Sequence, residues 1–382
     1  MTNPLIELTN AGQACWLDYL NRKILQGELA NLIKADGLRG LTSNPSIFEK
    51  AVAEADEYDK ALGELLARGK SKPVELYEGL AIADLQRAAD IFLPTFERLD
   101  GRDGFVSLEV SPYLAGDTQG TIVEAKRLWA AVARPNLMIK VPGTPEGAPA
   151  IRELIGHGIN INVTLLFGRD AYQAVAEAHM AGLEMLAAKG GELTKTHGVA
   201  SFFVSRIDTA IDKTIDEQLK TATAQAAASL KGLQGKVAIA NAKLAYQDYL
   251  QMIETPRWKA LAAAGAQPQR LLWASTGVKN PAYSDVLYVE NLIGPDTVNT
   301  MPPKTIEAFR DHGLVRPTLT EGVDAARKIL ADAEDQGLDL RGVTRQLVTD
   351  GVKLFAKAFD DLLATIDEKR FRLLGERRVA SR

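Results

Sequence analysis

The chain has 382 residues, of which 46% are hydrophobic and 25% charged, and its formal net charge is −4. These values are typical of a globular protein and argue against a general binder of nucleic acid or of acidic membranes. The single cysteine, Cys15, excludes an internal disulfide framework, suits a reducing compartment and is predicted to be a small core residue. MTNPLIELTN at the N-terminus lacks a signal-peptide pattern and no run reaches the ~20 apolar residues of a membrane span, so we expect a cytoplasmic protein.

Eight short segments of β-like sequence recur along the chain, each ending in polar or turn-forming residues. They predict strands at 14–18, 37–44, 104–110, 136–141, 158–164, 198–204, 270–275 and 297–302. Between them, apolar residues recur at helical spacing, most clearly in 124–133, 168–188 and 236–253. Alternating strands and helices form parallel βαβ units, and eight such units predict a closed (β/α)8 TIM barrel with additional helices.

Two helix starts carry capping residues. Ser46 with Glu49 fits a capping box, and Thr144 fits an N-cap before a first-turn proline. An open doubly wound sheet is the competing fold, and it usually has a glycine-rich phosphate-binding turn after its first strand. The nearest string, GDTQGT at 116–121, is neither G-x-G-x-x-G nor a P-loop, so the barrel is preferred.

The chain is longer than the ~250 residues of an ordinary barrel of this type. We assign much of the excess to two helical insertions, 46–100 and 206–268, and the remainder to a helical tail at 304–382. No internal repeat or Pro/Ser-rich hinge interrupts the sequence, so residues 1–382 are predicted to form one domain. For the insertion at 206–268 the sequence suggests no function beyond packing around the barrel.

The active site of such a barrel lies at the C-terminal ends of its strands. In chain order these ends carry Asp18, Thr42 and Asn44, Glu109, Lys140, Asn162 and Thr164, Ser201 with Arg206 just beyond it, Ser275 with Lys279 four residues on, and Asn299. Each has an ordinary explanation alone; a lysine that ends an apolar strand, for example, usually reaches out to water. Their gathering at one rim is what points to a functional site.

This set of side chains fits Schiff-base chemistry on a phosphorylated sugar. A neutral lysine amine attacks a ketone, and apolar surroundings favour the neutral amine. The iminium then withdraws electrons while the adjacent C–C bond breaks, and a carboxylate handles the proton of the departing alcohol. Amides and hydroxyls recognise a polyol, and arginine offers phosphate a bidentate contact. The residues alone do not choose between aldol cleavage, transfer and decarboxylation.

Five segments spread over most of the barrel carry recognisable motifs. They are LTSNPSIFEKA (41–51), NLMIKVPGTPEGAPAI (136–151), GININVTLLF (158–167), VASFFVSRID (199–208) and WASTGVKNPAYSDVLYVENLIGPDTVNTMP (273–302). In this order they resemble the transaldolase family, and the T-[ST]-N-P-S and I-K-V-P strings are highly specific when they occur together. The strings PGT and TGVKNP are similar to those of its longer bacterial type.

The resemblance implies a (β/α)8 barrel whose Schiff-base lysine lies on strand four, at the position of Lys140. By the same resemblance, Asp18 is the acid/base, and Glu109 and Thr164 hold a catalytic water. Asn44 and Asn162 contact the hydroxyls of the substrate, and Thr42 and Ser201 line the pocket. Arg206 and Ser275 bind the phosphate. Much of the family has an arginine two residues after the strand-seven serine. Here that position is Gly277, and Lys279 is the candidate to supply the charge, although lysine does not reproduce the bidentate contact.

The reaction implied by the resemblance moves a dihydroxyacetone unit between sugar phosphates in the non-oxidative pentose phosphate pathway. Sedoheptulose 7-phosphate and glyceraldehyde 3-phosphate give erythrose 4-phosphate and fructose 6-phosphate. The resemblance implies neither a metal nor an organic cofactor. The expected partners are sugar phosphates, without nucleic acid or membrane, and the chain is expected to be a monomer or a homodimer.

Two other functions stay open at the level of sequence. One is a class I aldolase that releases free dihydroxyacetone, and the other is a non-catalytic protein that binds sugar phosphates on the same scaffold. A histidine-based metal site is disfavoured, because His157, His179, His197 and His312 form no H-x-x-x-H pair and lie far apart in sequence.

Overall fold

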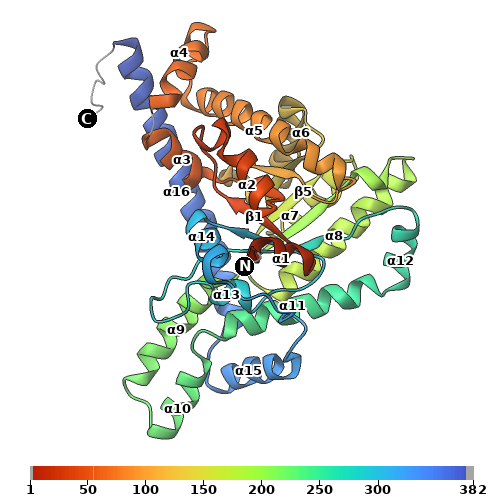
Figure 1. The fold of residues 1–382 in the computed structure, drawn as a ribbon, viewed down its shortest axis with the longest axis vertical. Helices are drawn as coiled ribbons and strands as arrows, with labels where there is room; N and C mark the ends of the chain where they lie inside the picture. The colour runs from red at the N-terminus through yellow and green to blue at the C-terminus, as the bar shows by residue number, and fades with distance from the viewer. Residues whose placement is uncertain (1–2, 55, 376–382) are drawn as a thin grey trace.

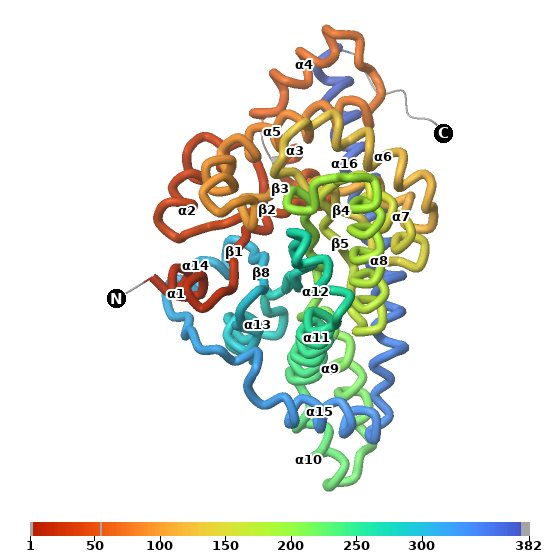
Figure 2. The backbone as a smooth tube through the Cα atoms, turned by 90° about the vertical axis from the view of Figure 1, so that its right-hand side faces the viewer, coloured from red at the N-terminus to blue at the C-terminus, as the bar shows by residue number. Residues whose placement is uncertain are grey.

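The computed structural model describes residues 3–54 and 56–375, which form a closed barrel of parallel strands with helices around it (Figures 1 and 2). The strands are β1 (Gln13–Asp18), β2 (Gly40–Thr42), β3 (Phe105–Glu109), β4 (Leu137–Pro142), β5 (Ile161–Leu166), β6 (Gly198–Phe203), β7 (Arg270–Ala274) and β8 (Thr297–Met301). Each strand pairs in parallel with the next, and β1 pairs with β8 to close the sheet. The predicted (β/α)8 barrel is therefore confirmed.

Two strands differ in extent from their predictions. β2 covers 40–42 rather than 37–44, because Gly37 adopts a left-handed conformation (φ 66°) that ends the preceding helix. β5 begins at Ile161 rather than at 158, because Gly158, with a φ of 74°, forms the turn that follows a helix. It also continues to Leu166, past a register irregularity against β6.

The helices alternate with the strands and extend beyond them. They are α1 (Pro4–Asn10), α2 (Glu28–Asp36), α3 (Pro45–Glu54), α4 (Asp59–Ala67), α5 (Pro73–Arg98), α6 (Thr118–Val132), α7 (Gly147–Ile155), α8 (Arg169–Ala188), α9 (Ser205–Leu219), α10 (Ala224–Leu233), α11 (Val237–Ile253), α12 (Pro256–Ala263), α13 (Leu287–Glu290), α14 (Pro303–His312), α15 (Val323–Asp335) and α16 (Leu340–Leu374). All three helices predicted from periodicity are present, as α6, α8 and α11. Among the described residues, none of the helices combines the length and the apolar character needed to cross a bilayer.

The two predicted helix caps have different outcomes. The capping box at Ser46 is wrong, because α3 begins at Pro45 and the side chain of Asn44 accepts a hydrogen bond from the backbone N–H of Ile47 at 3.0 Å. Thr144 does cap a turn, since its hydroxyl accepts from the N–H of Gly147 at 3.0 Å, although α7 itself begins only at Gly147.

The extra helices lie where the sequence placed them. The 46–100 insertion covers α4, α5 and all but the first residue of α3, and the 206–268 insertion covers α10, α11, α12 and all but the first residue of α9. The described part of the predicted tail contains α14, α15 and α16, whereas its last residues, 376–382, lie outside the described residues. α16 packs against α3, α5 and α9, and the blue ribbon of Figure 1 shows it passing beside α3. A segment late in the chain thereby reaches the C-terminal end of the barrel.

Close packing fills the other end of the barrel. Trp16 of β1 is fully buried against Phe105 of β3, with ring centroids 6.2 Å apart. Gly40 of β2 faces this ring, and a Cβ at that position would lie 2.5 Å from it, so only glycine leaves room for the indole. The barrel interior is thus a packed core below a site at its C-terminal end.

Candidate active site

A pocket of about 200 Å³ opens at the C-terminal ends of the strands. The predicted residues that line it are Asp18, Thr42, Asn44, Lys140, Thr164, Ser201, Arg206, Ser275 and Lys279. They come from six strands, or from the loops just beyond them, and from the first turn of α9. Residues far apart in sequence meet here because parallel strands bring their C-terminal ends to one rim.

Lys140 is buried, with only 5% of its surface exposed. Its Nζ lies 3.2 Å from Oε2 of Glu109 and donates a 3.4 Å hydrogen bond to the carbonyl oxygen of Ser43. The ring centroid of Phe355, from α16, lies 5.8 Å from the same nitrogen. The lysine therefore does not reach out to water, and its amine faces the interior of the pocket.

Glu109 is the direct neighbour of Lys140, since the two residues pair across β3 and β4. Burial raises the pKa of the Glu109 carboxyl, the Lys140 ammonium opposes this, and Asp18 adds to it. Apart from this ion pair, neither carboxylate oxygen of Glu109, nor the hydroxyl of Thr164, has a hydrogen-bond partner among the described residues. These buried acceptors can hold a water beside Lys140.

Asp18 forms the opposite wall, at the end of β1. The hydroxyl of Thr42 donates to its Oδ1 at 2.7 Å and lies 2.7 Å from the hydroxyl of Thr300. Because the single proton of Thr42 goes to the carboxylate, Thr300 donates to Thr42. Burial raises the pKa of Asp18, while Lys140 and the hydrogen bond from Thr42 act against that shift. A carboxyl with a raised pKa is suited to both taking and returning a proton.

Asn162 does not line the pocket but lies in a fully buried layer beneath it. Its side chain donates to the hydroxyl of Ser107 at 3.0 Å and accepts from the hydroxyl of Ser201 at 2.7 Å. Ser201 belongs to both layers, because it also lines the pocket. These hydrogen bonds hold Ser201 in one orientation at the base of the pocket.

The opposite end of the pocket is suited to an anion. Arg206 lies in the first turn of α9, with its guanidinium carbon 5.3 Å from the ring centroid of Phe203. Ser275 follows β7 in a left-handed conformation (φ 55°), and its hydroxyl lies 2.9 Å from that of Ser205. Non-glycine residues are strained in this conformation and such strain is frequent at functional sites. The arginine, the hydroxyls and the start of a helix together suit a phosphate.

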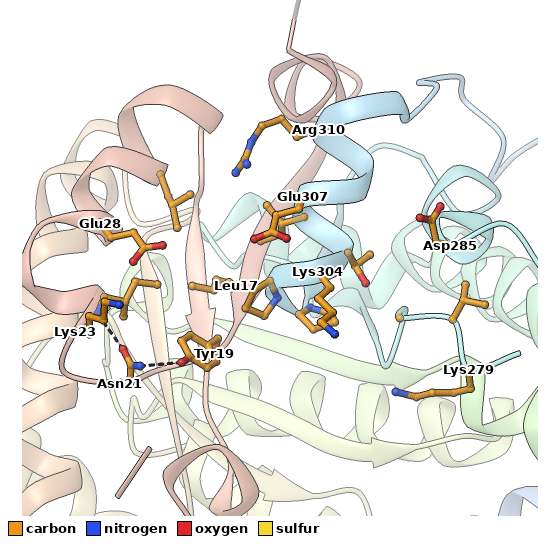
Figure 3. Close-up of a pocket in the computed structure, with 18 residues that line it drawn as sticks. Leu17, Tyr19, Asn21, Lys23, Glu28, Lys279, Asp285, Lys304, Glu307 and Arg310 are labelled. Atoms are coloured by element: carbon orange, nitrogen blue, oxygen red, sulfur yellow. Dashed lines mark hydrogen bonds between the residues drawn. The ribbon is translucent and has the colours of Figure 1, made fainter. Parts of the chain in front are cut away.

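A larger cavity, of about 840 Å³, adjoins the pocket and shares Gly277, Lys279 and Pro302 with it. Figure 3 shows Lys279 and Lys304 extending toward the same side of this cavity from two different segments. At Gly277 an added Cβ would lie 3.3 Å from both Pro302 and Thr305, so the loop here packs closely against the start of α14. The two cavities therefore share a wall at Gly277, Lys279 and Pro302.

Several site residues escaped the sequence analysis. Asn299 was predicted for strand eight, but the pocket is lined by Thr300, and Asn299 accepts a 2.8 Å hydrogen bond from Thr276 instead. The alternation of side chains along a strand could have identified Thr300, because only one of these two neighbours faces the barrel interior. No sequence pattern could have identified Phe355, since it lies on a helix and not at the end of a strand.

No group of three or more His, Cys, Asp and Glu side chains within 3–54 and 56–375 is placed to hold a metal ion. His179 and His197 are both buried, and burial lowers the pKa of each imidazole to about 4. Cys15 is buried, as predicted for a core residue.

Comparison with known proteins gives a consistent result along almost the entire chain. Residues 15–366 match the family model described as transaldolase/fructose-6-phosphate aldolase. A transaldolase of Trichodesmium erythraeum is 48% identical over 373 residues, which cover 97% of this chain and 98% of that protein. A transaldolase of Thiobacillus denitrificans is 50% identical over 94% of this chain and 98% of its own length. One of Thermobifida fusca is 47% identical over 97% of this chain and 99% of its own length.

Proposed function

Because this chain belongs to the transaldolase/fructose-6-phosphate aldolase family, we propose that Lys140 carries its transaldolase activity through a Schiff base with the donor ketose. The family match and the full-length relatives support the function itself, which is the transfer of dihydroxyacetone between sugar phosphates in the pentose phosphate pathway. The observation that carries the proposed mechanism is the burial of Lys140 between an ion-paired glutamate and the substrate pocket.

The first step joins the enzyme to the sugar. Lys140 first gives the proton of its ammonium to Glu109, and the neutral amine attacks C2 of the ketose. Glu109 then returns the proton, so that the carbonyl oxygen leaves as water and an iminium remains. In the apoenzyme Glu109 and the carbonyl oxygen of Ser43 hold the amine in place. Glu109 and Thr164 have the free acceptor positions to retain the released water beside the new iminium.

The second step breaks the C3–C4 bond. Asp18 takes the proton of the C4 hydroxyl, the aldose phosphate departs, and the bonding electrons move into the iminium to give an enamine on Lys140. Thr42 and Thr300 hold the Asp18 carboxylate in one orientation through their chain of hydrogen bonds. The reverse steps with a different aldose phosphate form the new C–C bond and return the proton.

The polar walls of the pocket bind the rest of the sugar. Asn44 and Ser201 offer hydrogen bonds to hydroxyl groups, and Asn162 orients Ser201 from below. Arg206 and Ser275 bind the phosphate. Lys279 provides the second positive charge, because the position at which much of the family has an arginine is Gly277 here. Since lysine contacts phosphate as a point charge, replacing Lys279 by alanine weakens phosphate binding without removing the site.

The finer expectations from the sequence belong to the same proposal. The chain forms one domain, which the closed barrel supports. It is cytoplasmic, which the single cysteine supports, and it binds neither nucleic acid nor membranes, which the net charge of −4 supports. Its expected oligomeric state is a monomer or a homodimer.

A coupled assay tests the function. Fructose 6-phosphate with erythrose 4-phosphate is expected to give sedoheptulose 7-phosphate and glyceraldehyde 3-phosphate, with little free dihydroxyacetone. Glyceraldehyde 3-phosphate that appears at the same rate without any acceptor, together with free dihydroxyacetone, would instead identify a class I aldolase.

A further inference from the structure

A second cavity reaches the Lys140–Glu109 ion pair from the side of the barrel. It has a volume of about 150 Å³ and lies between the end of β3, α5 and α6, with Phe359 of α16 in its wall. Glu109 lines this side cavity but not the substrate pocket, whereas Lys140 lines the substrate pocket but not the side cavity. The ion pair thus separates two spaces that have different walls.

The wall of the side cavity extends from the surface to the buried carboxylate. Val74, in the first turn of α5, is 38% exposed, whereas the side chain of Glu109 is only 3% exposed. Between them the wall is formed mostly by apolar residues, together with Tyr77, Ser111 and two further carboxylates, those of Glu78 and Glu124. At ~30 Å³ per molecule, a cavity of this size has room for about five waters.

The two further carboxylates are already engaged, in contrast to Glu109. Glu78 forms a bidentate pair with Arg127, and Glu124 accepts a 2.8 Å hydrogen bond from the N–H of Ser111. Glu109 has its ion pair with Lys140, but neither of its oxygens has a hydrogen bond from the described residues. A buried carboxylate in this situation attracts water, and the side cavity is where water can stand against it.

The reaction has a specific use for that water. Forming the iminium releases one water from C2 of the ketose, and hydrolysing the product iminium consumes one, so a complete transfer needs no net water. A bound sugar phosphate fills the 200 Å³ substrate pocket, which Phe355 also walls. While the donor or the product ketose is bound, the mouth is therefore a poor route for water, and it opens only between the departure of one aldose phosphate and the binding of the next.

We propose that the side cavity behind Glu109 is a water site through which the water of the Schiff-base steps exchanges with solvent, separately from the path of the sugar. The inference rests on the proposed function of Lys140. It gives the side cavity a role in the reaction. Phe355 lines the substrate pocket and Phe359, one helical turn later on α16, lines the side cavity.

The test follows the oxygen at C2 of the product. Fructose 6-phosphate and erythrose 4-phosphate react in H2¹⁸O, and sedoheptulose 7-phosphate is reduced with borohydride at early times. The fragment ion that contains C1 to C3 is analysed by mass spectrometry, after subtraction of enzyme-free exchange, because the aldehyde oxygen of erythrose 4-phosphate exchanges by itself and enters the product at C4. The wild-type product is expected to carry solvent oxygen at C2. Val74→Phe and Ile82→Phe, which both narrow the side cavity, are expected to lower the labelled fraction at least threefold while turnover stays within twofold.

Val123→Phe is the matched control, because Val123 is a 67% exposed valine on α6 that does not line the cavity. Val74→Ala, which widens the cavity at its exposed end, is expected to label at least as fully as the wild type. Equal labelling in Val74→Phe, Ile82→Phe and Val123→Phe would show that water uses the sugar's path and would overturn the inference. Failure of the proposed function has a different signature, namely active enzyme without any borohydride adduct on Lys140.

Discussion

At the N-terminal end of the barrel, Asp103 is held by two arginines and a tryptophan, whereas at the C-terminal end Lys140 faces one carboxylate. Asp103 is fully buried, lies 2.9 Å from Arg270 and 3.5 Å from Arg39, and accepts from the indole of Trp16 at 3.2 Å. Its partners come from β1, β7 and the segment before β2, so the charge links distant parts of the sheet.

The difference lies in the hydrogen bonds that each carboxylate accepts from the described residues: Oδ1 of Asp103 accepts two and its Oδ2 none, whereas neither oxygen of Glu109 accepts one. The Asp103 cluster connects strands, and losing one partner there leaves an uncompensated buried charge. Glu109, at the other end, has one ion pair and oxygens without hydrogen bonds, and Lys140 beside it lines an open pocket. The same fold thus uses buried charge for stability at one end and for chemistry at the other. The following variants are expected to change one of these two properties without the other.

Lys140→Met is expected to have the largest effect. Removing the amine eliminates the nucleophile, so transfer is expected to fall at least ~10⁴-fold, or about 5.5 kcal/mol in the activation barrier. The barrel should remain folded, because methionine fills a similar volume and Glu109, whose pKa burial already raises, can take up a proton. Steady-state rates and circular dichroism measure the two effects, and retention of more than a tenth of the activity would contradict the assigned role.

Asp103→Ala tests the opposite end. The change leaves Arg270 and Arg39 without their carboxylate, and the expected loss is about 3–5 kcal/mol of unfolding free energy. Turnover per folded molecule should stay within twofold, because the cluster lies away from the pocket. Urea unfolding and active-site titration measure these quantities, with Asp103→Asn as the isosteric comparison. A large fall in kcat in the folded protein would mean that the two ends are coupled.

Asp18→Asn is expected to lower kcat by about 10²- to 10³-fold with little change in KM, because proton transfer from the C4 hydroxyl loses its base. The wild-type rate should fall as pH drops through the pKa of Asp18, since only the carboxylate accepts the proton. Because burial raises this pKa, the acidic limb of the pH–rate profile should lie at a higher pH than the ordinary pKa of an exposed aspartate. Thr42→Val removes a hydrogen bond that lowers the pKa and should shift the limb to higher pH, whereas an unmoved limb would exclude Asp18 as the titrating base.

Asp208 is a buried carboxylate outside both the Asp103 cluster and the substrate pocket, and replacing it has the smallest expected effect. It accepts from the N–H of Ala238 and the hydroxyl of Tyr288, and burial raises its pKa from 3.8 to about 7. The folded state therefore binds the extra proton between about pH 4 and 7, and stability falls as pH rises through that range. Asp208→Asn should flatten this dependence by about 2 kcal/mol between pH 5 and 7 in urea unfolding, and an unchanged slope would contradict it.

The barrel can be predicted from the sequence because its signals are local and repeated. Each strand is a short apolar run with a polar end, and parallel pairing brings those ends to one rim whatever the loops between them do. Lys140, Asp18 and Thr164, which the sequence predicts at these strand ends, all line the pocket. The boundaries of β2 and β5 were less accurate because glycines with positive φ, which the pattern does not reveal, set them.

What the sequence missed depends on geometry between distant segments. Phe355 reaches the site only because α16 packs against the end of the barrel, and no periodicity encodes that docking. Asn162 occupies the right strand but lies one layer deeper, beneath the residues that line the pocket. The side cavity at Glu109 could not be predicted either, since its walls come from α5, α6, α16 and the end of β3, which no motif brings together.

The central claim is that Lys140 is the nucleophile, and borohydride trapping tests it most directly. The enzyme is incubated with fructose 6-phosphate alone, reduced, digested and mapped by peptide mass spectrometry. The account predicts a reduced three-carbon adduct on Lys140, release of glyceraldehyde 3-phosphate, and no adduct in Lys140→Met. An active enzyme with no adduct on Lys140, or with its adduct on another lysine, would contradict the account.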